Sequence, residues 1–462
     1  PALQRALDLG SVVIPVFILD PHLLDQPAPQ RQAFLFAGLY ALDAGLRVRG
    51  SRLVLRQGQP EVELARLMAE TGASCIIAEE DYTPYARTRD AAVAARLPLE
   101  LVLGVTVFHP AHVVKANGQP YRVFTPFSRA WKALPFPGAP APAPAALPPI
   151  PADLISLPIP AARPSSNPST SPSAIFPAGE AEAHRRLADF AAGPLSDYAD
   201  ARNRLDLDGT STLSPYLHLG MLSARQAAHA ALAAWQSAAP GAEVWLNELI
   251  WREFYHTILY HYPQVLKTAL NPELRRIPWR NAPADLRAWQ QGLTGYPVVD
   301  AAMRQLTTLG WMHNRARMIV ASFLVKDLLI NWQSGERWFM QALVDGDPAA
   351  NNGGWQWVAG VGADAAPYFR IFNPVLQSEK FDPAGRFIRH WVPELAAVPD
   401  GYIHAPWLMP PDVQRSCGVQ IGRHYPAPMV DHTRARERTL AAYRASAIET
   451  VTMTVTAPTS AS

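Results

Sequence analysis

The first 130 residues alternate between short apolar runs and longer amphipathic stretches. The apolar runs are rich in β-branched residues and lie at 11–19, 52–56, 74–80 and 99–104. Runs of this length and composition are typical of strands buried in a parallel sheet. The stretches between them, 30–46 and 61–71 for example, have the apolar spacing of helices. This alternation predicts an α/β domain with a doubly wound parallel sheet.

The pattern changes twice further along the chain. Residues 135–177 are dense in proline, alanine and serine. Because proline cannot donate a backbone hydrogen bond, we predict an extended, mobile connector there. From about residue 179, apolar residues recur at helical spacing, most clearly at 244–260, 296–309 and 315–329. We therefore expect an α/β domain at 1–131, a Pro/Ala-rich linker at 132–178, an all-helical domain at 179–446 and a disordered tail at 447–462.

The overall composition narrows the class of protein. Hydrophobic residues make up 49% and charged residues 17% of the 462 residues, which suits a well-packed protein of two domains. The only cysteines, Cys75 and Cys417, exclude a disulfide framework and a four-cysteine metal site within one chain, and they favour a reducing cytoplasm. We find no secretory signal pattern and no apolar run long enough to span a bilayer, since Lys326 and Asp327 interrupt the best one.

The net charge of +2 does not by itself indicate a nucleic-acid partner, so the clustering of basic residues matters more. Several basic residues of the C-terminal half fall near a tryptophan-rich motif: Arg315, Arg317, Arg370, Lys380, Arg386, Arg389 and Arg423. A solvated basic surface explains them as well as a nucleic-acid-binding surface does.

The tryptophan-rich motif begins at Asp345 and continues into an aromatic-basic run that ends at residue 373. It combines two aspartates, two adjacent asparagines and two tryptophans, Trp355 and Trp357. Gly353 and Gly354 precede the tryptophans and allow the backbone to approach a flat ligand closely. For an isolated Trp-Gln-Trp motif, a buried loop whose tryptophans fill space is the simpler interpretation. The functional interpretation therefore needs support from the rest of the chain.

Three other segments carry polar groups at turn or helical spacing. In 210–220, three hydroxyl residues precede a proline, a pattern that caps a helix and offers donors to a phosphate. Taken alone, a plain helix cap explains it better. In 245–255, a carboxylate, an indole and a guanidinium share one helical face, formed by Glu248, Trp251, Arg252 and Tyr255. In 310–318, polar groups lie beside a polarizable thioether: Asn314, Arg315, Arg317 and Met318.

Two further patterns do not indicate a site. The Gly-Val-Gly at 360–362 is not a dinucleotide fingerprint, because no strand-turn-helix unit with a distal acid surrounds it. His256 and His261 are five residues apart, which is poor spacing for metal ligands. We therefore predict no metal.

A family resemblance rests on five segments of the helical domain, in chain order: WLNELIWREFY, GYPVVDAAMRQL, GWMHNRARM, DGDPAANNGGWQW and PYFRIFNP. On these segments the chain resembles the DNA photolyase and cryptochrome family, most closely the bacterial class I cyclobutane pyrimidine dimer photolyases. VFTPFSRAW (123–131) and DYTPYARTRD (81–90) extend the resemblance into the first domain. It implies a Rossmann-like antenna domain, expected here without the family's first strand, followed by an all-helical FAD-binding domain.

The resemblance implies that FAD is held in a folded conformation by the helical domain. The matching positions are Tyr198, Thr210, Ser211, Thr212, Leu213, Ser214, Trp245, Glu248, Arg252, Asn314, Arg317, Asp345, Gly346, Asp347 and Asn351. An Arg317–Asp345 pair would flank the flavin ring, and Asn351 would face its N5 atom. A neutral amide can donate or accept a hydrogen bond, which suits a flavin that changes its redox state.

The resemblance also implies an enzyme, a carbon–carbon lyase that repairs DNA with light. Reduced FAD would transfer an electron to a cyclobutane pyrimidine dimer that has left the duplex, and the electron would return after the dimer splits. The residues that match the dimer and DNA contacts are Arg202, Glu248, Trp251, Asn314, Arg315, Met318 and Trp357. A photoreduction chain would comprise Trp355, Trp332 and Trp279, although core packing accounts for each of these indoles as well.

The second chromophore is left open by the resemblance. Folate-binding relatives carry an acidic residue after the Asp-Tyr motif, where this chain has Ala86, whereas Lys267 matches a folate-contacting lysine. Methenyltetrahydrofolate, a deazaflavin or flavin antenna, and an empty pocket all remain alternatives. We expect a cytoplasmic monomer whose partner is damaged DNA.

Three other functions compete with dimer repair. A cryptochrome-like light sensor is the main rival, but Asn351, Trp251 and Trp357 favour repair. A (6-4) photolyase would need its catalytic histidine pair where this chain has Asn314 and Met318. A nucleic-acid-binding flavoprotein without repair would keep the basic surface and lose light-dependent turnover.

Overall fold

The structure is a computed structural model that describes residues 1–26, 28–161 and 175–456, with side chains described as far as Ser446. The chain divides into two units. The first contains residues 1–199, 210–263 and 341–349, and the second contains 200–209, 264–340 and 350–462. The units interleave along the chain, whereas the predicted domains follow one another, so the predicted boundaries at 131, 178 and 446 stay a prediction.

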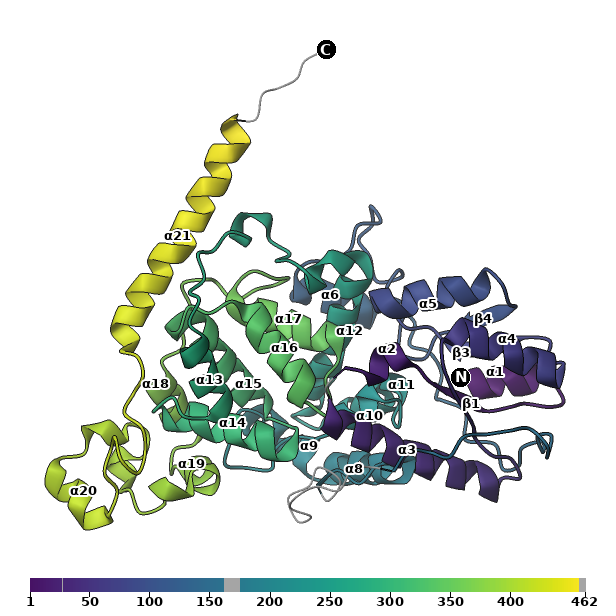
Figure 1. The fold of residues 1–462 in the computed structure, drawn as a ribbon, viewed down its shortest axis with the longest axis horizontal. Coiled ribbons are helices and arrows are strands. Elements are labelled where there is room, and N and C mark those ends of the chain that lie inside the picture. Colours follow the sequence, from purple (N-terminus) through teal and green to yellow (C-terminus); the bar gives the residue numbers. More distant parts are fainter. Residues whose placement is uncertain (27, 162–174, 457–462) are drawn as a thin grey trace. The chain divides into compact units, whose positions relative to one another are not determined.

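Two pairs of parallel strands form the sheet structure of the first unit (Figure 1). β1 (Val16–Leu19) pairs with β2 (Val54–Gln57), and β3 (Ile76–Glu79) pairs with β4 (Leu99–Val102). A helix connects the strands within each pair, as a parallel connection requires. All four strands overlap the predicted apolar runs, so the parallel α/β character of this region is confirmed.

The helices of the first unit follow the predicted pattern. α3, α4 and α5 each begin at a proline, whose fixed φ suits the first helical position. The helices are α1 (Ala2–Leu9), α2 (Pro21–Leu24), α3 (Pro29–Val48), α4 (Pro60–Thr71), α5 (Pro84–Ala94), α6 (Phe124–Ala133), α8 (Glu180–Ala192), α9 (Pro194–Ala201, ending in the second unit), α10 (Ser214–His218), α11 (Ala224–Gln236) and α12 (Ala242–His261).

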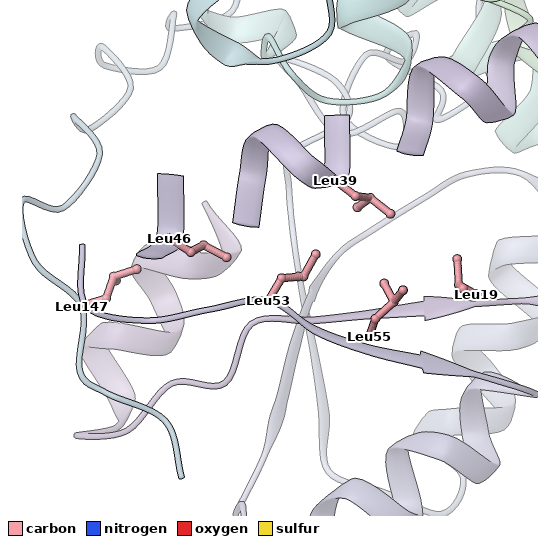
Figure 2. Close-up of a cluster of buried hydrophobic side chains, with 6 residues drawn as sticks. All are labelled: Leu19, Leu39, Leu46, Leu53, Leu55 and Leu147. Atoms are coloured by element: carbon pink, nitrogen blue, oxygen red, sulfur yellow. The ribbon is translucent and has the colours of Figure 1, made fainter. Parts of the chain in front are cut away.

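A cluster of leucines forms one core of this unit, between the first strand pair and α3 (Figure 2). Its members come from β1, α3, β2, the residue just before β2 and the proline-rich segment: Leu19, Leu39, Leu46, Leu53, Leu55 and Leu147. Each is at most 7% exposed. Because Leu147 belongs to the predicted linker, that segment contributes to the core of the α/β region.

The proline-rich segment is extended, as predicted, but part of it is firmly held. Its backbone runs along β2, where Leu157 N donates to Leu55 O (2.9 Å) and Leu55 N donates to Ser156 Oγ (2.9 Å). Arg52 Nη2 donates to Leu154 O (2.6 Å), and Leu154 itself is buried. The prediction of a mobile connector is therefore wrong for this part of the chain, because it is hydrogen-bonded to β2 and anchored by the buried side chains of Leu147 and Leu154. Residues 162–174 lie outside the described residues.

The second unit is helical. Its elements are η2 (Pro263–Leu266, its first residue in the first unit), η3 (Pro272–Leu274), α13 (Pro283–Gln291), α14 (Pro297–Leu309), α15 (Asn314–Ser322), η4 (Phe323–Asp327), α16 (Trp332–Ala342), α17 (Pro348–Ala359), α18 (Pro374–Phe381), α19 (Arg386–Trp391), η5 (Pro393–Leu395), η6 (Asp400–Tyr402), η7 (Pro406–Leu408), α20 (Pro411–Cys417) and α21 (His432–Thr456). The last residues of α16 and the first residues of α17 fall in the first unit. The helices predicted at 296–309 and 315–329 are present, the second as α15 followed by the π-helical η4.

Lys326 lies on η4 and is only 1% exposed. Its Nζ donates to Ala359 O (3.0 Å), the last carbonyl of α17, and to Tyr368 O (3.4 Å). The ammonium also lies 3.9 Å from the ring centroid of Tyr443. Burial lowers the pKa of Lys326 to about 7.

Helix α21 packs against η4 through the neighbouring residue, Asp327. His432 Nδ1 lies 2.6 Å from Asp327 Oδ1, and Thr439 Oγ1 donates to the backbone oxygen of Lys326. α21 extends to Thr456, so the predicted tail begins inside a helix, and 457–462 lie outside the described residues. Within residues 1–26, 28–161 and 175–456, no helix is both long and apolar enough to cross a membrane.

Candidate functional site

Helix α12 carries the predicted polar face as a half-buried stripe. Its four residues are each partly exposed: Glu248, Trp251, Arg252 and Tyr255. Arg252 Nη1 donates to Val105 O (2.8 Å), which fixes the guanidinium beside the loop after β4. One turn before the stripe, Trp245 is buried and its ring centroid lies 5.0 Å from that of Phe190. The predicted shared face is therefore present, with its aromatic and charged groups held in place.

Glu253, next to the stripe, is a buried carboxylate that the sequence analysis did not single out. Both of its oxygens lie 3.0 Å from Val107 N, and Oε2 also accepts from Phe108 N (3.4 Å) and Trp131 Nε1 (3.5 Å). Burial raises the pKa of Glu253 to about 7, although Arg252 and these hydrogen bonds oppose the shift. Glu253 thus ties α12 to the loop after β4 and to α6. Its partners are more than a hundred residues away, so no local spacing signals them.

The hydroxyl-rich segment 210–214 leads into the short helix α10. Thr212 has a φ of +50°, a left-handed conformation that is costly for a β-branched residue and recurs at binding loops. Its Oγ1 donates to Ser211 O (2.8 Å) and accepts from Arg186 Nη1 (2.9 Å). Arg186 is a second residue that the sequence analysis missed, because it lies on α8, far from the segment in sequence. Leu213 and Tyr198, also predicted here, are buried in the same unit.

The two aspartates of the tryptophan-rich motif lie among basic groups of the first unit. Arg31, on α3, donates to Leu343 O (3.0 Å), and a Cβ on Gly346 would overlap its guanidinium. Burial lowers the pKa of Arg31, and the carboxylates of Asp345 and Asp347 oppose that shift. A side chain at position 346 would therefore require the Arg31 guanidinium to move.

Asp347 also lies between two histidines, His218 at 3.6 Å and His256 at 3.5 Å. Burial alone would raise the pKa of Asp347, but His256, His218 and Arg252 hold it well below its ordinary value. Burial lowers the pKa of His256 to about 4. The cluster therefore holds Asp347 as an anion. No group of three or more potential ligands that could hold a metal ion occurs in the described part of the chain.

Helix α15, in the second unit, begins at a buried histidine. His313 Nδ1 accepts from Arg315 N (3.1 Å), and burial lowers the pKa of His313 to about 4. Arg315 Nη2 donates to Asn203 Oδ1 (2.6 Å), and its Cζ lies 4.5 Å from the ring centroid of Phe381. Arg317 Nε donates to Met312 O (2.8 Å). A neutral histidine cap thus sets the start of the helix, whose first five residues include four of the predicted site residues: Asn314, Arg315, Arg317 and Met318.

The Trp-Gln-Trp motif lies inside helix α17, so the simpler interpretation is wrong about a loop, although Trp355 does fill buried space. At 100° per residue, Trp355 and Trp357 point in directions about 160° apart. Trp355 is 2% exposed, whereas Trp357 is partly exposed. Asn351 and Gly354 occupy the arc between the two indoles, and a Cβ on Gly354 would meet nothing within 4 Å. This arc of α17 is therefore open at Gly354.

The opposite side of α17 is anchored by two buried amides, Asn352 and Gln356. Asn352 Nδ2 and Gln356 Nε2 both donate to Val265 O (3.1 and 2.9 Å), and Gln356 Oε1 accepts from Leu270 N (2.9 Å). On the open arc, Asn351 Nδ2 donates to Glu336 O (3.1 Å). These bonds fix the rotation of α17, and so the directions of its two indoles.

The tryptophans predicted to transfer electrons all belong to the second unit. Trp355 and Trp332 are buried, and Trp279 is partly exposed. Trp355 lies against Gly335 of α16, where a Cβ would overlap its ring, and Trp332 lies one turn before Gly335. The order from buried to exposed fits a chain that ends near solvent. The Nε1 atom of Trp355 is buried and has no hydrogen-bond partner among the described residues.

Other aromatic residues surround both ends of this series. The ring centroid of Trp355 lies 6.1 Å from that of Trp289 and 5.0 Å from that of Phe339. The ring centroid of Trp279 lies 6.1 Å from that of Tyr443. Trp289 thus offers a side branch that the sequence analysis did not consider.

Comparisons with known proteins define the class. Residues 245–445 match the family model described as the FAD binding domain of DNA photolyase, and residues 1–147 match the DNA photolyase model. The chain is 42% identical to the deoxyribodipyrimidine photo-lyase of Escherichia coli, over 91% of this chain and 89% of that protein. The chain belongs to the DNA photolyase family. The predicted family, fold class and FAD cofactor are confirmed.

Two solved structures show how far the similarity extends within the family. A bacterial class III photolyase from Agrobacterium tumefaciens is 39% identical, covers 96% of this chain and 94% of its own, and has a TM-score of 0.89. A cryptochrome from Synechocystis sp. is 31% identical with a TM-score of 0.87 and covers 95% of both chains. The identity to the class III enzyme is close to that with the E. coli protein, so the predicted class within the family stays a prediction.

Proposed function

We propose that this photolyase repairs cyclobutane pyrimidine dimers in DNA, driven by light that its reduced FAD absorbs. The observation that carries the proposal is the arrangement of α17. Asn351 lies between a buried indole, Trp355, and a half-buried indole, Trp357, on an arc that faces open space at Gly354. A cofactor beside Asn351 would have an electron-donating indole on one side and a substrate-binding indole on the other.

The residues of this site fit a flavin nucleotide. The hydroxyls of 210–214 offer donors to its phosphates. The guanidinium of Arg186, which donates to Thr212 Oγ1, adds positive charge beside these hydroxyls. Asn351 Nδ2 is engaged by Glu336 O, which leaves Oδ1 to accept a hydrogen bond from flavin N5. Bound FAD would supply the photoexcited electron that the dimer takes up. We assign its binding to the residues expected from the family: Tyr198, Thr210, Ser211, Thr212, Leu213, Ser214, Trp245, Glu248, Arg252, Asn314, Arg317, Asp345, Gly346, Asp347 and Asn351.

The proposed substrate must leave the duplex, because its reacting bond is inaccessible within the base stack. A dimer has lost stacking, so its extrusion costs less than that of intact bases. We assign Trp251 and Trp357 to apolar contacts with it and Glu248 to a hydrogen bond with a base edge. Asn314, Arg315, Met318 and Arg202 complete the proposed DNA contacts. We further propose that the chain acts as a cytoplasmic monomer, with its second chromophore still to be assigned.

The direct test is repair by purified protein that carries reduced FAD. We expect an oligonucleotide containing one dimer to be restored under blue or near-ultraviolet light and to remain unchanged in darkness. Chromatography of the intact oligonucleotide before and after illumination measures the product. A protein that binds FAD and responds to light, yet restores no dimer, would instead be a sensor of the cryptochrome kind, and the repair proposal would be abandoned.

DNA binding is expected to weaken as salt rises, because basic side chains displace counterions from phosphates. Lys380 lies 5.5 Å from the ring centroid of Phe381, which also carries the guanidinium of Arg315. Lys380→Ala should reduce the slope of log affinity against log salt by about 1, if it contacts one phosphate. Glu379→Ala, at the adjacent position, serves as a control. Fluorescence anisotropy at several salt concentrations gives both slopes, and equal slopes for Lys380→Ala and wild type would show that Lys380 contacts no phosphate.

A further inference from the structure

Trp251 does not stand alone on α12, because a phenylalanine ring lies flat against it. The ring centroids of Phe124 and Trp251 are 3.8 Å apart, and their planes differ by 3°. Both side chains are partly exposed and both belong to the first unit. Parallel contact at this distance places the two rings in van der Waals contact across their faces. One face of the Trp251 indole is therefore covered.

The other neighbours of Trp251 confine it further. Phe254 meets the indole edge to face, at 5.6 Å and 82°, and the ring of Tyr255 lies 5.6 Å away at 36°. Phe254 is itself buried, and its ring centroid lies 6.0 Å from that of Phe124. With Phe124 stacked on one face and Phe254 against its edge, the plane of the indole is fixed.

Phe124 cannot retreat from Trp251, because α6 is fastened along α12. Phe124 is the first residue of α6 and belongs to the inner face of the helix, with Phe127, Ser128 and Trp131. Ser128 Oγ donates to Asn247 Oδ1 (3.3 Å), and Trp131 Nε1 donates to the buried carboxylate of Glu253 (3.5 Å). These two bonds set the register of α6, so Phe124 lies opposite Trp251.

We propose that Phe124 is a positioning residue for substrate binding, which holds the Trp251 indole in the orientation that receives the dimer. This inference rests on the proposed repair function. A dimer is a puckered, non-aromatic group, so its apolar contact with an indole depends on how the indole is presented. Without Phe124, the indole could rotate toward the vacated side and would lose orientation before binding. Segment 123–131 was noted in the sequence only for its family resemblance, and this proposal gives it a role in substrate binding.

The test is a double-mutant cycle of Phe124→Ala and Trp251→Ala. Affinities are measured for an oligonucleotide with one dimer and for the same sequence without damage. Phe124→Ala should weaken binding of the dimer by about 2- to 10-fold, the range expected for one aromatic pair, and leave undamaged DNA unaffected. In the Trp251→Ala background, Phe124→Ala should add no further loss. The Michaelis constant for repair by pre-reduced protein should rise in Phe124→Ala with little change in maximal turnover.

Two further variants separate positioning from a general loss of packing. Phe124→Tyr keeps the ring and should retain wild-type discrimination. Phe36→Ala removes a partly buried ring that packs against the leucine cluster of the same unit, and should leave discrimination unchanged.

The outcomes distinguish the two proposals from each other. An unchanged preference for the dimer in Phe124→Ala, or an equal loss with and without Trp251, would overturn the positioning role. If the wild-type protein itself shows no preference for dimer-containing DNA, the proposed function fails first.

Discussion

Trp355→Phe is expected to reduce photoreduction of the oxidised protein to the level of the dark control, while repair by chemically pre-reduced protein continues. Trp355 is buried in the described structure and lies against Gly335 of α16, one turn from Trp332. Phenylalanine is much harder to oxidise than tryptophan, so the first electron transfer would be blocked. The substitution should be tolerated, because the buried Nε1 has no hydrogen-bond partner among the described residues. The measurement is the loss of oxidised-flavin absorbance under blue light with an external reductant.

Trp289→Phe is the matched control for this prediction. Its ring centroid lies 6.1 Å from that of Trp355, and it is equally buried, but it is not part of the predicted chain. Its Nε1 donates to Val320 O (3.0 Å), so the control also carries the loss of one hydrogen bond. Photoreduction should survive in Trp289→Phe and fall in Trp279→Phe. If Trp289→Phe abolishes photoreduction and Trp279→Phe does not, the electrons enter by the side branch.

The second large effect concerns stability and pH. Burial lowers the pKa of Lys326 to about 7, far below the ordinary lysine value. Between pH 7 and about 10 the unfolded chain therefore binds a proton at Lys326 that the folded chain does not. The free energy of unfolding should rise with pH across this window, by up to about 1.4 kcal/mol per pH unit from this group. The stability gained at high pH is fully lost once the pH falls through about 7, because the folded chain then also binds the proton at Lys326.

Other shifted groups act outside this window. Burial raises the pKa of Glu253 to about 7 and that of Asp300 to about 6. The stability that these two groups contribute at low pH is therefore lost as the pH rises to about 7, before the window from pH 7 to 10 begins. Burial also raises the pKa of Tyr443, which faces Lys326, so its contribution is lost only above the ordinary tyrosine value. The nearest carboxylate along the chain, Asp327, pairs with His432. The rise between pH 7 and 10 is therefore assigned to Lys326.

Lys326→Met tests this assignment. Methionine keeps an unbranched chain of similar length, and Ala359 O would still accept from Tyr443 Oη (2.6 Å). The variant should be more stable than wild type at pH 7 and should lose the dependence on pH between 7 and 10. Denaturant unfolding at several pH values measures both quantities. Parallel curves for the two proteins would show that another group is responsible.

The sequence predicted elements whose evidence is local. The half-buried stripe of α12 follows directly from helical spacing, and so do the four strands and most helix positions. It did not reveal Arg31, Arg186 or Glu253, because each meets its partners through contacts between segments far apart in the chain. The helical state of 348–359 was obscured by adjacent glycines, which disfavour helix in isolation. Its two buried amides, through long-range bonds to Val265 and Leu270, outweigh that preference.

The packed part of the proline-rich segment has a consequence for association between molecules. A strand at the edge of a sheet offers unpaired backbone groups to any other extended chain. Along β2 the proline-rich segment of the same chain pairs with these groups, since Ser156 Oγ accepts from Leu55 N and Leu157 N donates to Leu55 O. The segment therefore keeps this edge of β2 from pairing with neighbouring molecules in solution. Shortening it would expose β2, and the first symptom would be aggregation at high protein concentration, before any loss of light response.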